Sequence, residues 1–432
     1  MENYLFEKMS VPKAYMKLAL PVVLSMIVSL VYNMVDTYFI ALTGVQELVA
    51  GVSLVAPMFT LMIAFGDIFG LGGSSAISRL LGEKKDNEAK KTCAFCIWIS
   101  LVFGLCISAI LLLFRTQILG LLGVGKDTYQ YANAYYTWIA IGAVSIIFSM
   151  VPSNILRTEG LAVQSMAGSI IGSIVNIIFD PIFIFGLNQG AAGAAMATVF
   201  AQAISVIFAL MLLFKRKLPF KITKHDFKIN PHCVRALKIG LPLALQECLT
   251  QISFLALCAF INRLGLEASS GYGVACKIVN FAMLVPSSLM QSMASFVAQN
   301  VGAGDEKRAK HAMFTGMGIG LIIGVVVFIL VLFKGDLLTS IFTTEKAVIL
   351  QGYAYLKGFA LETIVTAILF SMVGYFNGHY QTVWVMVQGL IQTLLVRLPL
   401  SYYMSIQPHA NLTNIGLAAP IAIIVGIILN VC

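Results

Sequence analysis

The stretch Gly82-Glu-Lys-Lys-Asp-Asn-Glu-Ala-Lys90 has a counterpart in Gly302-Ala-Gly-Asp-Glu-Lys-Arg-Ala-Lys310, and the two align without a gap at a shift of 220 residues (82 to 302). Each copy is a short charged segment between two long apolar runs. The same shift takes Gly51 to Gly271. Self-similarity at a fixed spacing predicts that the chain consists of two halves with the same topology.

The amino-acid composition excludes several protein classes. Charged residues make up 11% of the 432 residues, against roughly 25% in soluble domains, and hydrophobic residues make up 59%. A soluble enzyme, a disordered chain or a coiled coil would need more polar surface than this. The apolar runs are long and unbroken, as in Leu101–Leu113, whereas the strands of a membrane β-barrel alternate apolar and polar residues. We therefore predict an all-α integral membrane protein.

Apolar runs between polar breaks predict twelve transmembrane helices, since each span needs about 20 apolar residues. The predicted spans are 14–42, 49–80, 91–113, 128–156, 160–187, 191–214, 235–262, 268–300, 311–333, 347–376, 380–405 and 413–432.

A long basic segment near the middle of the chain separates the first six spans from the last six. We therefore predict two six-helix bundles related by the internal repeat. The N-terminal lobe covers 1–214, a cytoplasmic linker loop covers 215–234, and the C-terminal lobe covers 235–432. Repeats of this kind are typical of transporters that hold their substrate between the two lobes.

The distribution of basic residues predicts the orientation. Of the 28 Lys and Arg residues, 20 lie at the N-terminus or on the loops that follow even-numbered spans, and 6 lie on the opposite side. The positive-inside rule then places both termini in the cytoplasm of a plasma-membrane protein. The basic loops are expected to contact anionic lipid, so no nucleic-acid partner is predicted. The first apolar run is too long for a cleaved signal peptide. We expect a monomer.

Acidic residues inside predicted spans are the strongest functional clues, because a charge at mid-bilayer costs roughly 3 kcal/mol or more. The N-terminal half has Asp36, Asp67 and Asp180 in spans, with no Lys or Arg predicted beside them. Asp36 and Asp180 lie 6 and 7 residues before the outer ends of their spans, and Thr198 lies 7 residues after the outer start of its own. All three are therefore about 10 Å below the outer face. Asn176 lies one turn below Asp180.

This group of oxygen atoms predicts a cation site in the N-terminal lobe. Two carboxylates, an amide and a hydroxyl could hold Na⁺, because hard cations prefer oxygen ligands. The two carboxylates could instead share a proton, because like charges in a low-dielectric site resist double ionisation. A net-negative pocket also suits a cationic drug. The coupling ion, H⁺ or Na⁺, stays open, and no cofactor or structural metal is predicted.

Periodic polar residues predict which helix faces line a substrate cavity. Gln164, Gly168, Gly172, Asn176 and Asp180 recur every fourth residue, although the glycines also fit close helix packing. Methionine surfaces adapt to varied ligands, but each aromatic or Met side chain also fits a core or lipid-facing position. The predicted cavity residues are Ser29, Tyr32, Asn33, Tyr135, Tyr136, Gln164, Gln202, Met283 and Met290.

The C-terminal half carries charges of both signs inside its predicted spans. Glu247 and Glu362 are accompanied by Lys277 and Arg397, so this half is formally balanced. A second cation site there is therefore not favoured, and Glu247 with Lys277 also fits a buried ion pair. We predict these four residues as candidate functional charges of the C-terminal lobe.

Five stretches of the chain match one family pattern. They are Leu20-Pro21 through Met34-Val-Asp36-Thr37, Ile77–Gly82, Val297–Gly302, Asn176–Pro181 and Gly190–Ala195. In these motifs the chain resembles the MATE (multidrug and toxic compound extrusion) transporters, and the resemblance spans nearly the whole chain. It is most similar to the DinF-like branch, because the first and fifth predicted spans both carry Asp.

The resemblance implies a cation-coupled antiporter that exports drug-like organic compounds, cationic or amphipathic, by alternating access between two lobes. It also implies that the positions matching Asp36, Asn176, Asp180 and Thr198 form the cation site. It suggests that the helix bends at Pro21 when this site is protonated, and a permanent proline kink is the alternative.

Two other functions stay open at this stage. A lipid-linked oligosaccharide flippase of the same superfamily would prefer a cationic central groove, which the net-negative N-terminal half does not suggest. A membrane-embedded enzyme would need a catalytic constellation, and the sequence shows none.

Overall fold

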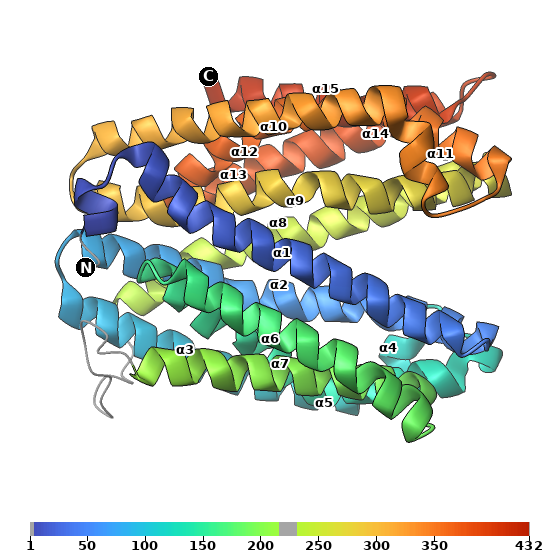
Figure 1. The fold of residues 1–432 in the computed structure, drawn as a ribbon, viewed down its shortest axis with the longest axis horizontal. Coiled ribbons are helices and arrows are strands. Elements are labelled where there is room, and N and C mark those ends of the chain that lie inside the picture. Colours follow the sequence, from blue (N-terminus) through green and yellow to red (C-terminus); the bar gives the residue numbers. More distant parts are fainter. Residues whose placement is uncertain (1–3, 216–230, 432) are drawn as a thin grey trace. The chain divides into compact units, whose positions relative to one another are not determined.

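The structure, a computed structural model, describes residues 4–215 and 231–431. Within these ranges the chain is almost entirely helical and forms no strand (Figure 1). Its elements are η1 (Tyr4–Lys8), α1 (Val11–Leu42), α2 (Gln46–Gly82), α3 (Asp86–Leu113), α4 (Arg115–Leu121), α5 (Lys126–Thr158), α6 (Ala162–Pro181), η2 (Ile182–Gly186), α7 (Gly190–Lys215), α8 (Pro231–Asn262), α9 (Leu266–Gly302), α10 (Glu306–Ser340), α11 (Lys346–Phe359), α12 (Glu362–Gly378), α13 (Thr382–Leu390), η4 (Ile391–Arg397), α14 (Leu398–Ser405) and α15 (Leu412–Val431).

The helices are long and apolar enough to confirm the predicted membrane fold. Among the described residues, 11 helical segments could each cross a membrane, and α11 with α12 forms one more span bent by 48°. The helix α6 runs on into η2, and α13 runs through η4 into α14, so each of these groups makes a single span. An all-α membrane protein with twelve transmembrane helices is therefore confirmed.

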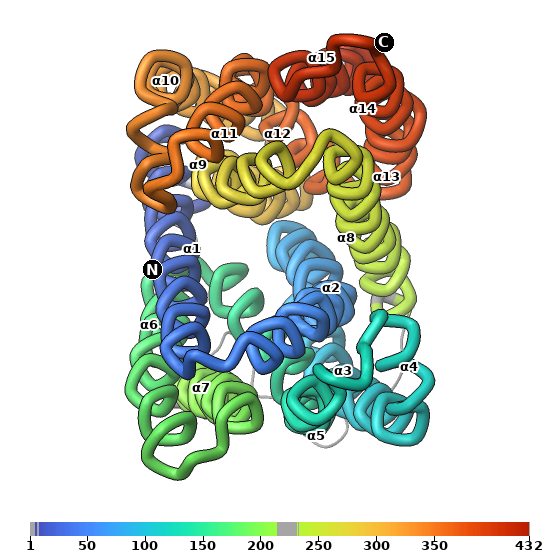
Figure 2. The backbone as a smooth tube through the Cα atoms, turned by 90° about the vertical axis from the view of Figure 1, so that its right-hand side faces the viewer, coloured from blue at the N-terminus to red at the C-terminus, as the bar shows by residue number. Residues whose placement is uncertain are grey.

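The two halves of the chain repeat the same helices and the same packing partners. Both α1 and α8 have 32 residues, and both α2 and α9 have 37. In the first half α5 packs against α2, α3 and α7, and in the second half α12 packs against α9, α10 and α15 (Figure 2). The internal repeat read from the charged stretches is thus also present in the helix packing.

The charged stretches of the repeat form the same turn in both halves. Lys84 and Gly304 occupy equivalent positions, and both have left-handed backbone, with φ values of 58° and 79°. In each copy the next residue donates its backbone N–H to a carbonyl five positions earlier at 2.9 Å, Lys85 to Leu80 in the first. Glycine adopts this conformation without steric cost, so the second copy is the less strained one.

The described helices group into two compact units. Unit 1 comprises Met1–Leu5 and Leu20–Ala244, and unit 2 comprises Phe6–Ala19 and Leu245–Cys432. The division passes through α1 and α8, close to Pro21 and Pro242. The first segment of each helix is therefore grouped with the opposite half. The lobe boundaries expected from the sequence stay a prediction, and most of the predicted linker lies outside the described residues.

Glycines allow the first segment of α8 to lie directly on the backbone of α2 within unit 1. A Cβ atom added at Gly240 would lie 1.9 Å from the carbonyl oxygen of Ile68, and one at Gly72 would lie 2.4 Å from that of Ala236. Backbone atoms cannot rotate aside as a side chain can. Small residues at such contacts let membrane helices approach closely and gain van der Waals contact.

We expect Gly240→Ala to destabilise the protein by about 1–3 kcal/mol, because the added methyl group overpacks the contact with α2. The matched control is Gly318→Ala on α10, where a Cβ atom would meet nothing within 4 Å. This variant should be neutral or more stable by up to about 1 kcal/mol, since Ala is the better helix former. Thermal unfolding of the detergent-solubilised protein measures both. Equal melting temperatures for the two variants would contradict this packing.

Candidate functional site

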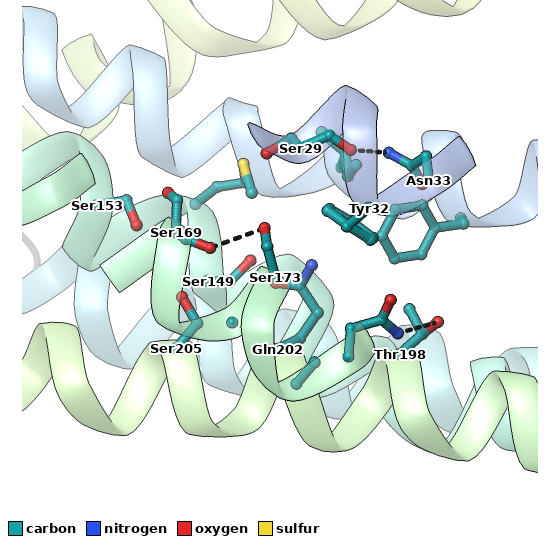
Figure 3. Close-up of a pocket in the computed structure, with 16 residues that line it drawn as sticks. Ser29, Tyr32, Asn33, Ser149, Ser153, Ser169, Ser173, Thr198, Gln202 and Ser205 are labelled. Atoms are coloured by element: carbon teal, nitrogen blue, oxygen red, sulfur yellow. Dashed lines mark hydrogen bonds between the residues drawn. The ribbon is translucent and has the colours of Figure 1, made fainter. Parts of the chain in front are cut away.

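A polar cavity of about 180 Å³ lies among α1, α2, α5, α6 and α7 of unit 1 (Figure 3). None of its sixteen lining residues is charged, and most carry a hydroxyl or amide group. Six of them are serines, from four different helices. The polar residues that line the cavity are Ser29, Tyr32, Asn33, Ser149, Ser153, Ser169, Ser173, Asn176, Thr198, Gln202 and Ser205.

At one edge of this cavity, three side chains from α6 and α7 form a buried cluster. The amide Nδ2 of Asn176 donates to Oδ1 of Asp180 at 3.4 Å and to Oγ1 of Thr198 at 3.5 Å. These distances exceed the usual 2.7–3.2 Å range, so both bonds are weak. Asn176 and Asp180 are 1% and 0% exposed, and Thr198 is 7% exposed. The hydroxyl of Thr198 donates its proton to the carbonyl of Ala194 at 3.2 Å.

Asp36 on α1 completes the cluster. It lies close enough to Asp180 for the two carboxyl groups to interact directly. Three buried oxygens in the group, Oδ1 of Asp36, Oδ1 of Asn176 and Oδ2 of Asp180, have no hydrogen-bond partner among the described residues. Each such atom costs about 1–3 kcal/mol when it stays unpartnered. A proton or an oxygen-preferring cation would supply the missing partner.

Two tyrosines connect the acidic cluster to its surroundings. Tyr32 on α1 and Tyr135 on α5 lie within electrostatic range of both Asp36 and Asp180. Tyr32 also lines the cavity, whereas Tyr135 does not. The cavity and the carboxyl groups therefore share neighbours on α1.

Several residues predicted from helical periodicity lie together in the structure. Asp36, Asn176, Asp180 and Thr198, drawn from three helices, form one cluster. The structure also brings four of the predicted cavity residues into the lining of the adjoining cavity. These are Ser29, Tyr32, Asn33 and Gln202. That this group binds a cation and a substrate stays a prediction.

Other predicted cavity residues lie outside the cavity lining. Tyr136 is buried in the apolar core of unit 1, and its hydroxyl donates to a backbone carbonyl of α3 at 2.9 Å. Gln164 lies on α6 but not among the lining residues. Met283 and Met290 belong to unit 2 and pack against its apolar clusters. For Tyr136 and the two methionines, the core alternative describes their packing.

Apart from Ser29, the serines of the cavity were not predicted from the sequence. Two serine pairs have a spacing of four residues, Ser149 with Ser153 on α5 and Ser169 with Ser173 on α6. Asn176 and Asp180 have the same spacing. Serine in an apolar helix can satisfy its hydroxyl on a carbonyl of the same helix, as Ser173 does with Ser169 at 3.0 Å. Such a serine is equally compatible with simple helix packing. Only the four-residue spacing within each pair indicated a polar helix face.

Asp67 has a basic neighbour that the sequence did not suggest. Arg157, near the end of α5, interacts electrostatically with Asp67 on α2. The hydroxyl of Thr158 also contacts the carbonyl of Ser74 at 3.4 Å, joining the same two helices. The expectation that no Lys or Arg accompanies the acids of this half is therefore wrong for Asp67. In the described part of the chain, no ion pair forms with the other two acids.

Unit 2 has a different arrangement of buried charge. Glu362, at the start of α12, is 6% exposed and interacts with Arg397 at the end of η4. The guanidinium carbon of Arg397 lies 4.7 Å from the ring centroid of Phe254 on α8. The buried acid of this unit therefore has a cation within electrostatic range, whereas the acids Asp36 and Asp180 of unit 1 face each other. The Oε2 atom of Glu362 nevertheless has no hydrogen-bond partner among the described residues.

The suggested ion pair between Glu247 and Lys277 is not formed among the described residues. The Lys277 ammonium lies 5.5 Å from the ring centroid of Phe342. Glu247 instead accepts a hydrogen bond from Gln251 at 3.1 Å, one turn along the exposed part of α8. The two side chains thus have separate partners.

Comparison with known proteins relates both halves of the chain to one family. The sequence model of the MatE family matches residues 21–182 and 242–403. The multidrug export protein MepA of Staphylococcus haemolyticus (strain JCSC1435) is 30% identical over 382 residues, covering 88% of this chain and 83% of that protein. MepA of Staphylococcus saprophyticus is 28% identical over 400 residues, with 90% and 87% covered.

Solved structures share the fold along nearly the whole chain. An outward-facing multidrug resistance MATE family transporter of the MOP superfamily aligns with a TM-score of 0.94 at 24% identity, covering 99% of this chain and 96% of that one. A MOP superfamily transporter from Pyrococcus furiosus, described as having a binding pocket of reverse polarity, aligns with a TM-score of 0.93 at 23% identity, with 99% and 97% covered.

We expect Asp180→Asn to raise the thermal stability by about 1–3 kcal/mol, because the amide removes a buried acid and can donate to the unpartnered oxygens. The matched control is Asp127→Asn, an exposed residue in the first turn of α5. That variant should lose about 0.3–1 kcal/mol, since an acid at a helix N-terminus is favourable. Thermal unfolding in detergent at neutral pH compares them. A less stable Asp180→Asn protein would show that the acid stabilises the fold.

Proposed function

The chain belongs to the MatE family of membrane transporters, and on that premise we propose that it exports small organic compounds by cation-coupled antiport. It is a multi-pass membrane protein. The bias of basic residues supports a plasma-membrane location with both termini in the cytoplasm. Members of this family are transporters rather than enzymes. The protein is proposed to act as a monomer in lipid, without a cofactor or a nucleic-acid partner.

The observation that carries this proposal is the cluster of buried, unpartnered oxygens beside a polar cavity. Asp36, Asn176 and Asp180 each contribute one such atom. Buried, unpartnered carboxyl groups are costly, so their presence inside a membrane protein indicates a functional role. A cation is the ligand that carboxylate and amide oxygens suit best. The geometry supports H⁺ and Na⁺ equally, because both use the same oxygens.

Shared residues support exchange rather than simple binding. Asn176 and Thr198 belong to the acidic cluster and also line the cavity. A cation that reorients Asn176 therefore changes the surface that a substrate would contact, and a substrate in turn changes the cation ligands. Such reciprocal coupling is what antiport needs, since each ligand must favour a different state.

The cavity supports an amphipathic, cationic substrate. Its hydroxyl and amide groups accompany apolar contacts from Phe59, Ile63 and Met150, and two carboxyl groups lie at its edge. The volume of about 180 Å³ is smaller than the roughly 300–1,000 Å³ typical of drug-sized pockets, so in this conformation it holds only part of a molecule. The lining contains no Lys or Arg, so it offers no support for an oligosaccharide flippase.

Replacing Asp36 with Asn tests the proposed cation site. In vesicles that contain the purified protein, Asp36→Asn should reduce ethidium export to the level of empty vesicles, because the pair loses one carboxylate. Asp127→Asn, the same change at an exposed position, should export normally. Applying a pH gradient and a Na⁺ gradient separately identifies the coupling ion. If Asp36→Asn and Asp180→Asn both export as well as the unmodified protein, the proposed cation site is wrong.

Filling the cavity tests the proposed substrate site. Ser169→Leu places a bulkier side chain in the lining, so we expect ethidium affinity to fall roughly tenfold, equivalent to about 1.4 kcal/mol. A cation added to the purified Ser169→Leu protein should still change the protein's fluorescence, because the acidic residues are unchanged. Ser53→Leu, at an exposed position on α2, is the matched control. Unchanged ethidium titrations in Ser169→Leu would exclude this cavity as the substrate site.

A further inference from the structure

The first segment of α1 is fixed inside unit 2. Tyr15 is fully buried, and its hydroxyl donates to the backbone carbonyl of Leu289 on α9 at 2.7 Å. Ala14, Leu18 and Ala19 are also buried, each at most 3% exposed. This segment therefore packs as part of unit 2, although it opens the sequence of the other half.

Arg308, in the first turn of α10, holds the residues just before this segment. Its Nε donates to the carbonyl of Phe6 at 2.6 Å, and its Nη2 donates to the carbonyl of Met9 at 2.5 Å. The guanidinium carbon also lies 5.6 Å from the ring centroid of Phe296, which contacts the Phe6 ring at 5.9 Å. We call these contacts the Arg308 latch. Hydrogen bonds from a charged donor are stronger than neutral ones.

The position of Arg308 is unfavourable for the helix that carries it. Asp305 caps α10, so Arg308 is the third residue of the helix. A positive charge in the first turn opposes the helix dipole, where an acid would be favourable. The charge of the capping residue Asp305 lies within electrostatic range of Arg308 and offsets part of this cost. The hydrogen bonds from Arg308 to Phe6 and Met9 join α10 to the residues that precede α1.

Beyond the latch, α1 leaves unit 2 and enters unit 1. The change of unit falls between Ala19 and Leu20, next to Pro21. Proline has no N–H to donate to the preceding turn, so the helix bends there more easily than elsewhere. The remainder of α1 carries Tyr32 of the cavity and Asp36 of the acidic cluster.

We propose that Arg308 is a positioning residue for transport: it ties the start of α1 to unit 2, so that changes at the cation cluster reach unit 2 through the bend at Pro21. This inference rests on the proposed function. With the start of α1 held by Arg308 and Tyr15, the weakest point of the helix is the proline. A rearrangement of Asp36 is then converted into bending of α1 rather than into detachment of its first segment.

The counterpart helix α8 is fixed by other means. Its first segment lies in unit 1 and is held by backbone contact at Gly240 and Gly72. Such contact cannot be removed without adding atoms, whereas the Arg308 latch consists of side-chain bonds. Arg308 can therefore be tested by deletion while the helix packing stays intact.

The test uses the full-length protein with Arg308→Ala, Arg308→Lys and Tyr15→Phe. Lys307→Ala is the matched control, because Lys307 is an exposed basic residue in the same turn. In detergent, ethidium binding to Arg308→Ala should stay within about twofold of the unmodified protein. In vesicles, the stimulation of ethidium export by a cation gradient should fall by about fivefold or more, the range of a typical coupling energy. Arg308→Lys and Tyr15→Phe should lie between, and Lys307→Ala should match the unmodified protein.

A distance measurement separates the latch from transport itself. Spin labels at the exposed positions 8 and 310, both within unit 2, should give a narrow distance distribution that broadens in Arg308→Ala. Undiminished coupling, an unchanged distribution, or parallel loss of ethidium binding in both Arg308→Ala and Tyr15→Phe would overturn the positioning role. If the unmodified protein shows no cation-driven export, the proposed function fails instead, and the distances still decide whether Arg308 holds the segment.

Discussion

Burial of Asp36 and Asp180 next to each other is the constraint around which unit 1 is organised. Two acids inside an apolar bundle are costly, and the amide and hydroxyl groups beside them in the described part of the chain leave three oxygens unpartnered. A basic residue beside the two acids would remove that cost, but within the described part of the chain neither of them forms an ion pair. The cluster therefore stays open to a proton or a cation, and the adjoining cavity shares its residues.

The two halves share the same helix arrangement but differ in their buried charges. Their helices, turns and packing partners repeat, down to the left-handed residues Lys84 and Gly304. Their buried charges do not. Unit 1 holds two acids beside a polar cavity, whereas in unit 2 the single buried acid Glu362 has Arg397 within electrostatic range. This difference in charge supports placing the proposed cation site in unit 1.

Much of the candidate site could be predicted from the sequence because an α-helix converts spacing into direction. Asn176 and Asp180, one turn apart, had to share a face, and membrane topology set the depth of Asp36 and Thr198. The sequence did not predict the serine pairs of α5 and α6, Ser149 with Ser153 and Ser169 with Ser173. A serine hydroxyl can donate to a carbonyl of its own helix, so its presence in an apolar helix does not by itself indicate a cavity. Tyr136 packs in the core of unit 1 because an aromatic side chain near a polar face can equally point into the core.

The sequence by itself determined the membrane class, the twelve helices, the repeat and the acids that had to be inside. Hydropathy and the 3.6-residue period decide these, because lipid forces every backbone hydrogen bond into the helices. Only the tertiary structure decided that α1 starts in unit 2 and continues in unit 1, and that Arg308 binds the backbone just before α1. Such contacts join positions about 300 residues apart, and no local pattern records which distant carbonyl a side chain will reach.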